Sequence, residues 1–572
     1  MDTTSGVSAL QHVTGSDAAV ELHRRLNRTA VEYPRERGVP ELFAGRARRR
    51  PAAPAVVQGE RTLTYAELDA LSNGLALELT AQGVTPGATV GVCVARSPEL
   101  VVALLAVLKC GAAYLPFDAS WPDERLYGLF DDAGCRWVVS DLPLAARLGG
   151  RRLIPVGAAP PSAAGPAVEV TADAIAYINF TSGSTGRPKG VPIRHRGITR
   201  LVFGARYAEL GAGSRLLQLA PVTFDAATFE IWGALLHGGT CVLYPDPHLR
   251  LSKLGRVLRD QGVTVLFLTT ALFNTVIGEA PDALDGVRTV LTGGEICSVR
   301  HLRQALDRYG PGRLVHVYGP TESTTFATYH PIDAIPQGAT TLPIGRPLQN
   351  TRLYVVDGDD LCGPGVSGEI WLAGDGLATG YLGRPELTAD RFVERVICGE
   401  PERLYRTGDF GFLRPDGELV FQGRRDDQVK INGFRIELGE IAHHLDLHPA
   451  VTACYVTVGA AGDRAVWAFA VTDDASVTPT SLREHLRARL PGYMVPSRIH
   501  LCETLPLTAT GKVDRDALLA ARTGVRARPG PDRVSGHVPE AREAPGPPEL
   551  PELPEPLQPA EAGRDDRGAD HE

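Results

Sequence analysis

Residues 181–190, TSGSTGRPKG, form a run of hydroxyl side chains and glycines that includes Lys189 and ends at Gly190. Glycine lets the backbone approach an anion closely, and exposed N–H and hydroxyl groups donate hydrogen bonds to it. A phosphate-binding loop is therefore one interpretation, and an ordinary surface turn is the other. The loop is not a Walker P-loop, because no Gly-Lys-Ser/Thr sequence ends it.

Four other charged residues lie in short motifs where they have both a structural and a chemical interpretation. Asp225 precedes a predicted helix and fits an N-cap, a position that Asp fills well. Glu322 follows a YGPT sequence and fits the first turn of a helix, where the dipole favours a carboxylate. Asp409 and Lys512 both fit turns. None of these motifs alone decides between the two interpretations.

The elements that must position these residues follow an alternating pattern. Residues 176–180 predict a short buried strand before the loop, and residues 195–207 predict a helix after it. Strands at 56–57 and 90–94 alternate with helices, one starting at Thr64 and one over 99–108. The alternation extends to about residue 420 and predicts a mostly parallel sheet that is covered on both faces.

The chain is too long for one compact core, since it has 572 residues. A polar lead-in is expected over 1–38 and a large core over 39–424. A charged joint at 423–427 precedes a small α+β domain, which we expect over 425–522. Residues 523–572 are rich in Pro and Glu, so they are predicted to be disordered.

Composition excludes several function classes. The net charge of −8 gives no electrostatic footprint for nucleic acid or an anionic membrane. The nine cysteines lack any Cys-x-x-Cys pair, which favours free thiols in a reducing cytoplasm. The N-terminus lacks the features of a signal peptide. The longest apolar run, 100–108, is too short to span a bilayer and predicts a buried helix. We therefore expect a cytoplasmic protein without a membrane partner.

Six motifs stand in order along the chain: residues 181–190, YGPTE at 318–322, YRTGD at 405–409, NGFRIE at 432–437, LPGYMVP at 490–496 and TGKVD at 510–514. Together they resemble the adenylation domains of nonribosomal peptide synthetases, within the acyl-CoA ligase and luciferase superfamily. The likeness spans about residues 40 to 520. It implies an α/β fold, with a large N-terminal core of stacked mixed sheets and helices hinged to a small C-terminal α+β domain. No carrier-protein motif follows Lys512, so a free-standing form is expected.

The resemblance implies two half-reactions. A carboxylate and ATP give acyl-AMP and pyrophosphate, and the phosphopantetheine thiol of a separate peptidyl carrier protein then displaces AMP. An ionised carboxylate needs no general base, so alignment and positive charge must supply the catalysis. Lys512 and Thr185 are the implied catalytic residues, and Glu322 is the implied Mg²⁺ ligand. The ATP-binding residues implied are Thr181, Ser182, Gly183, Ser184, Thr185, Gly186, Lys189, Gly294, Glu295, Tyr318, Thr321, Asp409, Arg424 and Lys512.

The resemblance also identifies a substrate pocket. Asp225 would pair with an α-ammonium group, which separates amino-acid activators from fatty-acid, acetate and aryl-acid ligases. The pocket positions are Asp225, Ala226, Phe229, Phe267, Leu291, Gly293, Val317, Thr325 and Phe326, with Lys512 at the other charged end. Between the charged ends only Thr325 is polar, and a charged side chain buried there would lack a partner. The predicted substrate is an aliphatic amino acid such as valine or isoleucine, followed by leucine or 2-aminobutyrate.

Three further expectations complete the interpretation. Asp426 matches the hinge about which the small domain would turn after adenylation. Many relatives need an MbtH-like helper protein, and no residue here decides that need. Two alternatives stay open: an acyl-CoA or aryl-acid ligase, which Asp225 opposes, and a catalytically inactive scaffold relative, which Lys512, Glu322 and Asp409 oppose.

Overall fold

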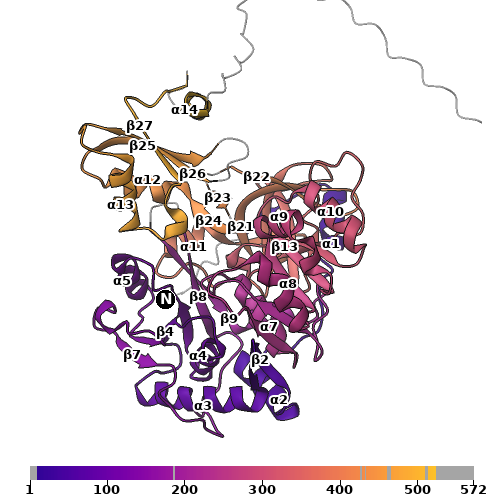
Figure 1. Cartoon of the computed structure of the whole chain (residues 1–572). Helices are drawn as coiled ribbons and strands as arrows, with labels where there is room; N and C mark the ends of the chain where they lie inside the picture. Colours follow the sequence, from indigo (N-terminus) through magenta and orange to yellow (C-terminus); the bar gives the residue numbers. More distant parts are fainter. Residues whose placement is uncertain are drawn as a thin grey trace, which may run out of the picture.

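The computed structural model describes residues 10–183, 187–425, 428–431, 433–459, 465–508 and 513–523. Within these ranges the chain forms a large N-terminal part with three sheets and a small C-terminal part (Figure 1). The expected α/β class, with a large core and a small C-terminal domain, is confirmed. Lys512, Asp426 and residues 184–186 of the glycine loop lie outside the described residues, as does the tail from residue 524.

Two sheets of mostly parallel strands make up the first part of the core. The six-stranded sheet has the order β7-β6-β4-β5-β8-β9, and only β8 and β9 are antiparallel. The nine-stranded sheet has the order β16-β15-β14-β13-β12-β10-β11-β2-β3. The strands of the first sheet are β4 (Thr89–Cys93), β5 (Ala113–Pro116), β6 (Trp137–Ser140), β7 (Arg152–Pro155), β8 (Ile175–Thr181) and β9 (Lys189–Arg194). Those of the second are β2 (Pro54–Gln58), β3 (Arg61–Thr64), β10 (Arg215–Gln218), β11 (Thr240–Leu243), β12 (Val265–Thr269), β13 (Thr289–Gly293), β14 (Leu314–Tyr318), β15 (Thr328–Pro331) and β16 (Arg346–Pro347).

Helices cover these sheets. Helix α4 (Pro98–Lys109) contacts β2 of one sheet and β5 of the other, so it is buried on all sides. This confirms the buried helix predicted from the apolar run. Helix α3 (Tyr65–Ala81) begins with the predicted capping box, in which the side chains of Thr64 and Glu67 each accept from the other's backbone N–H. The remaining helices of the large part are α1 (Asp17–Leu26), α2 (Val39–Arg49), α5 (Asp123–Asp132), α6 (His195–Val202), α7 (Ala226–Leu235), α8 (Leu251–Asp260), α9 (Thr270–Glu279), α10 (Val299–Tyr309) and α11 (Pro385–Arg391).

The alternation of strands and helices ends earlier than predicted. Beyond β16 the chain supplies six strands of a seven-stranded sheet, and β1 from the start of the chain is the seventh. The order is β1-β20-β21-β19-β17-β18 with β22 on β21, and all pairs are antiparallel except β1 with β20. Most of its consecutive strands are joined by short connections, as antiparallel pairing allows, but the connection from β19 to β20 contains helix α11. The strands are β1 (Gln11–Val13), β17 (Thr351–Asp357), β18 (Asp360–Leu361), β19 (Gly368–Gly374), β20 (Phe392–Ile397), β21 (Glu400–Leu413) and β22 (Leu419–Arg424).

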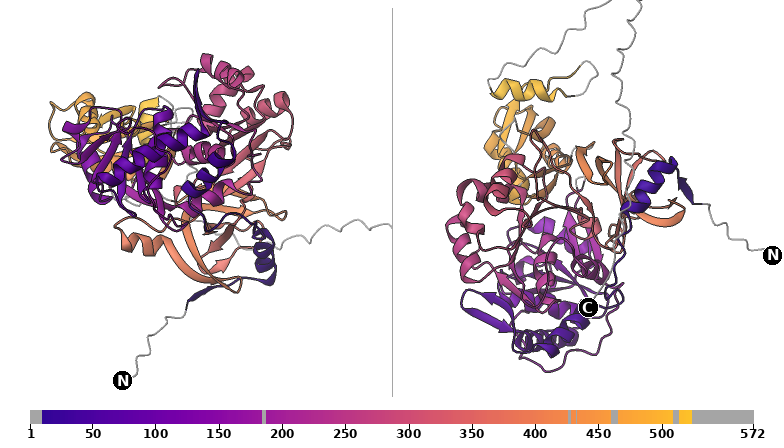
Figure 2. Two further views of the ribbon diagram at one scale, coloured as in Figure 1. Left: turned by 90° about the horizontal axis from the view of Figure 1, so that it is seen from below. Right: turned by 90° about the vertical axis from the view of Figure 1, so that its right-hand side faces the viewer.

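The start of the chain is more structured than its polar composition indicates. Strand β1 adds an edge to the third sheet, and α1 packs on β17 (Figure 2). Leu22 is buried in the main core, and the His23 ring accepts the N–H of Val355 through Nε2. Long-range contacts therefore order a segment whose own sequence predicts only a surface lead-in. The predicted helix over 195–207 is also shorter, ending at Val202.

The small C-terminal part begins with a hairpin of β23 (Gln428–Ile431) and β24 (Phe434–Glu437). A three-stranded sheet of β25 (Val451–Val458), β26 (Val466–Thr472) and β27 (Arg498–Cys502) follows. Helices α12 (Leu438–Asp446), α13 (Pro479–Arg487) and α14 (Arg515–Thr523) complete this part. Ile441 and Leu445 of α12 lie in its own hydrophobic core, as the sequence pattern predicts.

Candidate active site

The candidate amino-acid pocket forms where β12, β13 and β14 end side by side. Parallel pairing sets Phe267 beside Leu291, and Gly293 beside Val317. A cavity of about 120 Å³ lies at these strand ends. Of the predicted substrate residues it is lined by Asp225, Ala226, Phe267, Val317, Thr325 and Phe326. Phe229, Leu291 and Gly293 are buried behind it and do not line it.

Aromatic rings make one wall of this cavity. The ring centroid of Phe326 lies 5.4 Å from that of Phe229 and 5.5 Å from that of Phe267. Phe229 therefore backs the pocket through Phe326 without touching the cavity. A wall of this kind fits an apolar side chain and disfavours a charged one.

Asp225 stands at the start of α7, yet its side chain caps no helix N–H group. The N-cap interpretation therefore does not explain this carboxylate. Burial raises the pKa of Asp225, and a hydrogen bond from Thr321 and the charge of Lys430 oppose that rise. A desolvated carboxylate is stabilised by a cationic partner, so the position suits an ammonium group.

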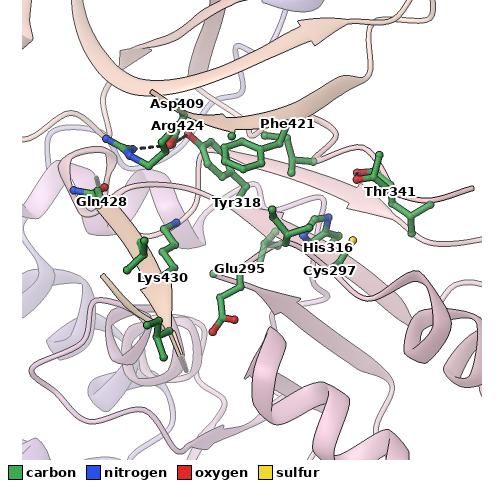
Figure 3. A pocket seen from close by; sticks show the side chains of 18 of the residues that line it. Glu295, Cys297, His316, Tyr318, Thr341, Asp409, Phe421, Arg424, Gln428 and Lys430 are labelled. Atoms are coloured by element: carbon green, nitrogen blue, oxygen red, sulfur yellow. Dashed lines mark hydrogen bonds and ion pairs between the residues drawn. The ribbon is translucent and has the colours of Figure 1, made fainter. Parts of the chain in front are cut away.

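A second cavity, of about 330 Å³, adjoins the first and contains the predicted nucleoside residues Gly294, Glu295, Tyr318, Asp409 and Arg424 (Figure 3). Asp409 of β21 and Arg424 of β22 are register partners, and Arg424 Nη1 lies 2.5 Å from Asp409 Oδ1. The Tyr318 hydroxyl donates to the other carboxylate oxygen of Asp409. These contacts orient the carboxylate and the tyrosine ring along one side of the cavity.

Sequence reasoning missed several residues of this second cavity. The ring of Phe421 lies 6.2 Å from that of Tyr318, and Lys430 Nζ lies 5.7 Å from the Tyr318 ring centroid. Burial lowers the pKa of Lys430, while Asp409 raises it. Lys430 belongs to the small C-terminal part, in the strand just before the 432–437 motif. In the sequence, its position next to that motif was the signal that could have identified Lys430 as a site residue.

Glu322 is fully buried among three side chains. Arg435 Nη1 lies 2.9 Å from Oε2, the Tyr381 hydroxyl donates to Oε1 at 2.8 Å, and Lys189 Nζ lies 3.8 Å from Oε1. Burial acts to raise the pKa of Glu322, but Arg435 and Lys189 outweigh it and hold that pKa well below its usual range. Burial and the charge of Arg435 lower the pKa of Lys189 to about 8.

The hairpin of the small part closes over the site. Gly433 N donates to Glu295 Oε1 at 2.7 Å, and Ser182 Oγ donates to the Arg435 carbonyl at 2.9 Å. The N–H of Gly183 donates to Glu440 Oε2 at 3.3 Å. Three predicted ATP-binding residues, Ser182, Gly183 and Glu295, therefore contact the small part here. The motif at 432–437 marks this hairpin, but no local pattern identifies its partners.

A third, mostly apolar cavity of about 280 Å³ reaches the pocket from another side. Phe224 and Phe434 line both cavities, and their rings meet edge to face at 4.7 Å. The Phe434 ring also stacks on Tyr493 at 4.2 Å. Other residues that line the third cavity include Leu219, Ala220, Pro221, His248 and Leu249, with Arg96 and Glu230 as its charged members.

Membrane-spanning helices and clustered metal ligands do not occur in the described part of the chain. Among those residues, no helix is long and apolar enough to cross a membrane. No group of three or more His, Cys, Asp and Glu side chains suited to a metal ion is found in the same ranges.

The chain belongs to the AMP-binding enzyme family. The model of that family matches residues 43–382, and the AMP-binding enzyme C-terminal domain matches residues 440–512. The two matches cover most of the large and small parts described above. They define the chain as an adenylate-forming ligase.

The relatives narrow this class to the adenylation domains of nonribosomal peptide synthetases. One subunit of the linear gramicidin synthase of Brevibacillus parabrevis is 45% identical over 506 residues, which are 86% of this chain and 6% of that protein. Another subunit of the same synthase is 44% identical over 90% of this chain and 10% of its own length. The chain thus spans a tenth or less of these two relatives.

Solved structures agree with this assignment. Holo-PA1221, a nonribosomal peptide synthetase protein containing adenylation and PCP domains, has 35% identity and a TM-score of 0.78, with 88% of this chain and 86% of that chain covered. The NpsA-ThdA fusion from Klebsiella oxytoca, an adenylation-PCP di-domain, has 29% identity and a TM-score of 0.76, with 81% and 86% covered. The resemblance inferred from the six motifs is confirmed.

Proposed function

We propose that the protein activates an aliphatic α-amino acid as its aminoacyl-AMP and passes it to the phosphopantetheine thiol of a separate carrier protein. The observation that carries this proposal is the Asp225 carboxylate, which caps no helix and lies at a small cavity with aromatic walls. The cavity opens beside the nucleoside residues, since Gly294, Asp409 and Arg424 line both. An amino acid bound there would present its carboxylate towards ATP.

The position of each predicted nucleotide-binding residue indicates a separate role for it. Tyr318 would stack on adenine, and the Asp409 carboxylate would accept the ribose hydroxyls beside Arg424. Lys189 would contact the phosphates together with the loop 181–186, part of which lies outside the described residues. Lys512 and Thr185 also lie outside the described residues, and we propose them as the catalytic residues.

Adenylate-forming enzymes in general use Mg²⁺ with ATP, and Glu322 fits such an ion. Its carboxylate is buried, is held in the ionised form and is the hard oxygen ligand that Mg²⁺ prefers. Phosphate oxygens and water would supply the other ligands, because Mg²⁺ usually takes one or two carboxylates only. When bound, the ion would offset charge on the triphosphate.

The second half-reaction fits the position of the small part. In this structure Lys430, Phe434 and Arg435 of the small part line the amino-acid pocket, and Lys430 also lines the nucleoside cavity. The third cavity shares Phe224, Ala226 and Phe267 with the amino-acid pocket. A mostly apolar cavity next to the pocket suits the pantetheine arm of a carrier protein, and Asp426 is the proposed hinge.

The relatives also supply the main alternative. Solved structures of NpsA are described in complex with 3-hydroxyanthranilyl-AMSN and with 3-hydroxybenzoyl-AMSN, which are aryl-acid compounds. An aryl-acid or acyl-CoA ligase would need no partner for an ammonium group at position 225. An inactive scaffold relative is the other alternative.

The test is pyrophosphate exchange across the proteinogenic amino acids and 2-aminobutyrate, run beside a set of aryl and fatty acids. We expect exchange with valine, isoleucine or a close aliphatic analogue. Closely related aliphatic substrates should overlap, because one methylene changes binding by only about 10- to 200-fold. A best substrate that is charged, or that is a large aromatic amino acid, would contradict the pocket assignment. Exchange with no acid at all would support the scaffold alternative.

A further inference from the structure

The turn after β14 contains two adjacent residues in the left-handed backbone region. The φ angles are 52° for Thr324 and 69° for Thr325. Threonine is β-branched, and such residues adopt this conformation only where the surroundings hold them in it. Thr325 and Phe326 line the amino-acid pocket, and the Thr325 hydroxyl donates to the Asp225 carbonyl at 2.9 Å. The shape of the pocket therefore depends on a strained turn.

Arg200 of α6 holds this turn from behind. Its Nη1 atom donates to the carbonyl of Phe326 at 2.8 Å, and Nη2 donates to the carbonyl of Ser323. These two carbonyls flank the two strained threonines. One rigid guanidinium thus bridges both ends of the turn, which the flexible ammonium group of a lysine cannot do in the same geometry.

The surroundings of Arg200 are shaped for this contact. A Cβ atom at Gly376 would lie 1.8 Å from Arg200 Nη2, so only glycine leaves room for the guanidinium. The Gly376 carbonyl accepts the Thr324 hydroxyl at 2.7 Å. On the other side, a Cβ atom at Gly197 would lie 2.5 Å from that hydroxyl oxygen. Two glycines thus make space for the turn and for the arginine that holds it.

Burial of Arg200 is costly. The side chain is fully buried, and no carboxylate in the described part of the chain lies within ion-pair distance of it, although the charge of Asp375 acts on it from farther away. Burial lowers the pKa of Arg200 to about 10, so the guanidinium still carries its charge at neutral pH. Burying a charge destabilises a fold unless hydrogen bonds or opposite charges offset the lost hydration. Here those bonds go to the turn.

We propose that Arg200 is a positioning residue for amino-acid selection: it holds the Ser323–Phe326 turn in its strained conformation and thereby sets the wall of the substrate pocket. The proposal rests on the proposed function for the identity of the substrate. Arg200 itself does not line the amino-acid cavity. Thr325 and Phe326 of the turn line the amino-acid cavity and do not line the nucleoside cavity, so loss of Arg200 should weaken the binding of the acid more than that of ATP.

The test compares Arg200→Lys with a matched control, Gln349→Met. Gln349 is also buried, and it donates to the carbonyls of Arg200 and Leu201 at 2.9 and 3.1 Å, so these bonds go to α6 rather than to the turn. KM for the amino acid and KM for ATP are measured by pyrophosphate exchange, together with the urea midpoint of unfolding. For Arg200→Lys we expect KM for the amino acid to rise about tenfold, and KM for ATP to change by less than about twofold. Gln349→Met should leave KM for the amino acid and KM for ATP unchanged, although it lowers the urea midpoint about as much as Arg200→Lys does.

A rescue variant separates positioning from a general structural role. Glycine adopts the left-handed region without strain. Thr324→Gly in the Arg200→Lys background therefore removes much of the backbone strain that Arg200 counteracts in the parent protein. We expect KM for the amino acid to return to within about threefold of the parent value. If Arg200→Lys does not fold, Gly376→Ala displaces the guanidinium instead and should give the same KM pattern.

Three outcomes would overturn the proposal: an equal rise of both KM values, an equal effect in the Gln349→Met control, or no recovery with Thr324→Gly. The substrate of the parent protein shows whether the proposed function itself fails, separately from the role of Arg200. If the parent activates an acid without an α-amino group, the proposed function is wrong, and the role of Arg200 is then tested on KM for that acid.

Discussion

Arg435 Nη1 lies 2.9 Å from one carboxylate oxygen of Glu322 and 3.1 Å from the other, although the two residues belong to different parts of the fold. The pair is buried, so each charge depends on the other for its stabilisation. The small part therefore delivers a cation to the carboxylate that we propose as the Mg²⁺ ligand. Arg435 and a metal ion would compete for the same oxygens, which links the position of the small part to the stage of the reaction.

This relationship predicts that Arg435→Ala separates the two half-reactions. The variant loses the contact that holds the hairpin on Glu322, so we expect carrier loading to fall about tenfold or more while pyrophosphate exchange changes by less than about threefold. Arg435→Lys should recover part of the loading. Equal loss of exchange and loading would contradict the assignment of this contact to the second step.

The proposed hinge predicts a similar separation at another residue. Asp426→Pro fixes φ at the joint, so it should spare amino-acid-dependent exchange and abolish transfer to a carrier thiol. Both reactions are measured on one preparation, with radiolabelled pyrophosphate for the first and a labelled amino acid on a phosphopantetheinylated carrier for the second. Asp427→Pro tests whether the effect is specific to position 426. Equal loss of both half-reactions in Asp426→Pro would argue against the hinge.

Lys189 and Lys512 should contribute unequally to the rate of adenylation. Lys189 contacts Glu322 and lies 4.9 Å from the centroid of the Tyr381 ring, at one edge of the site. We expect Lys189→Ala to slow exchange about tenfold, and Lys512→Ala to slow it about 1,000-fold or more, because positive charge at the reacting phosphate contributes most in the transition state. The reverse order would make the loop at 181–190 the main source of catalysis.

The pKa of Lys189 predicts a pH dependence. Burial and Arg435 lower this pKa to about 8, so the ammonium form is lost as the pH rises through that value. We expect kcat/KM for ATP, which reports on the free enzyme, to fall on the alkaline side with this pKa. Lys189→Arg keeps its charge at high pH and should move the fall to higher pH. An unchanged profile in Lys189→Arg would assign the fall to another group.

Local sequence signals predicted the elements that depend on local physics. The capping box at Thr64, the apolar run of α4 and the amphipathic face of α12 are each complete within one segment, and the structure has all three. The alternation of strands and helices did not predict the antiparallel sheet after β16, because the pairing of its strands is set by contacts across the sheet and not by a pattern within one segment. Strand β1 depends on pairing with β20, about 380 residues away, and no local sequence pattern predicts this strand.

The site shows the same division. The sequence predicted Asp225, Glu322, Tyr318 and Asp409 as site residues. In the structure Thr321 donates a hydrogen bond to Asp225, and the charge of Lys430 interacts with both Asp225 and Asp409. Arg435 and Phe434 were noted only as parts of a motif. Their partners, Glu322 and Tyr493, are set by how the small part docks, which depends on tertiary packing. Arg200 carries no motif, and only the φ angles of Thr324 and Thr325 draw attention to it.

The most direct test of the account compares two acids with one carbon skeleton. Valine and 3-methylbutanoate differ only in the α-ammonium group that Asp225 is proposed to bind. We expect the protein to support pyrophosphate exchange with valine at least about 100-fold better than with 3-methylbutanoate, because the acid without the ammonium group leaves a buried carboxylate unpaired. Asp225→Asn should reduce this preference to less than about tenfold. Equal exchange with the two acids, or a preference that Asp225→Asn leaves intact, would contradict amino-acid activation at this site.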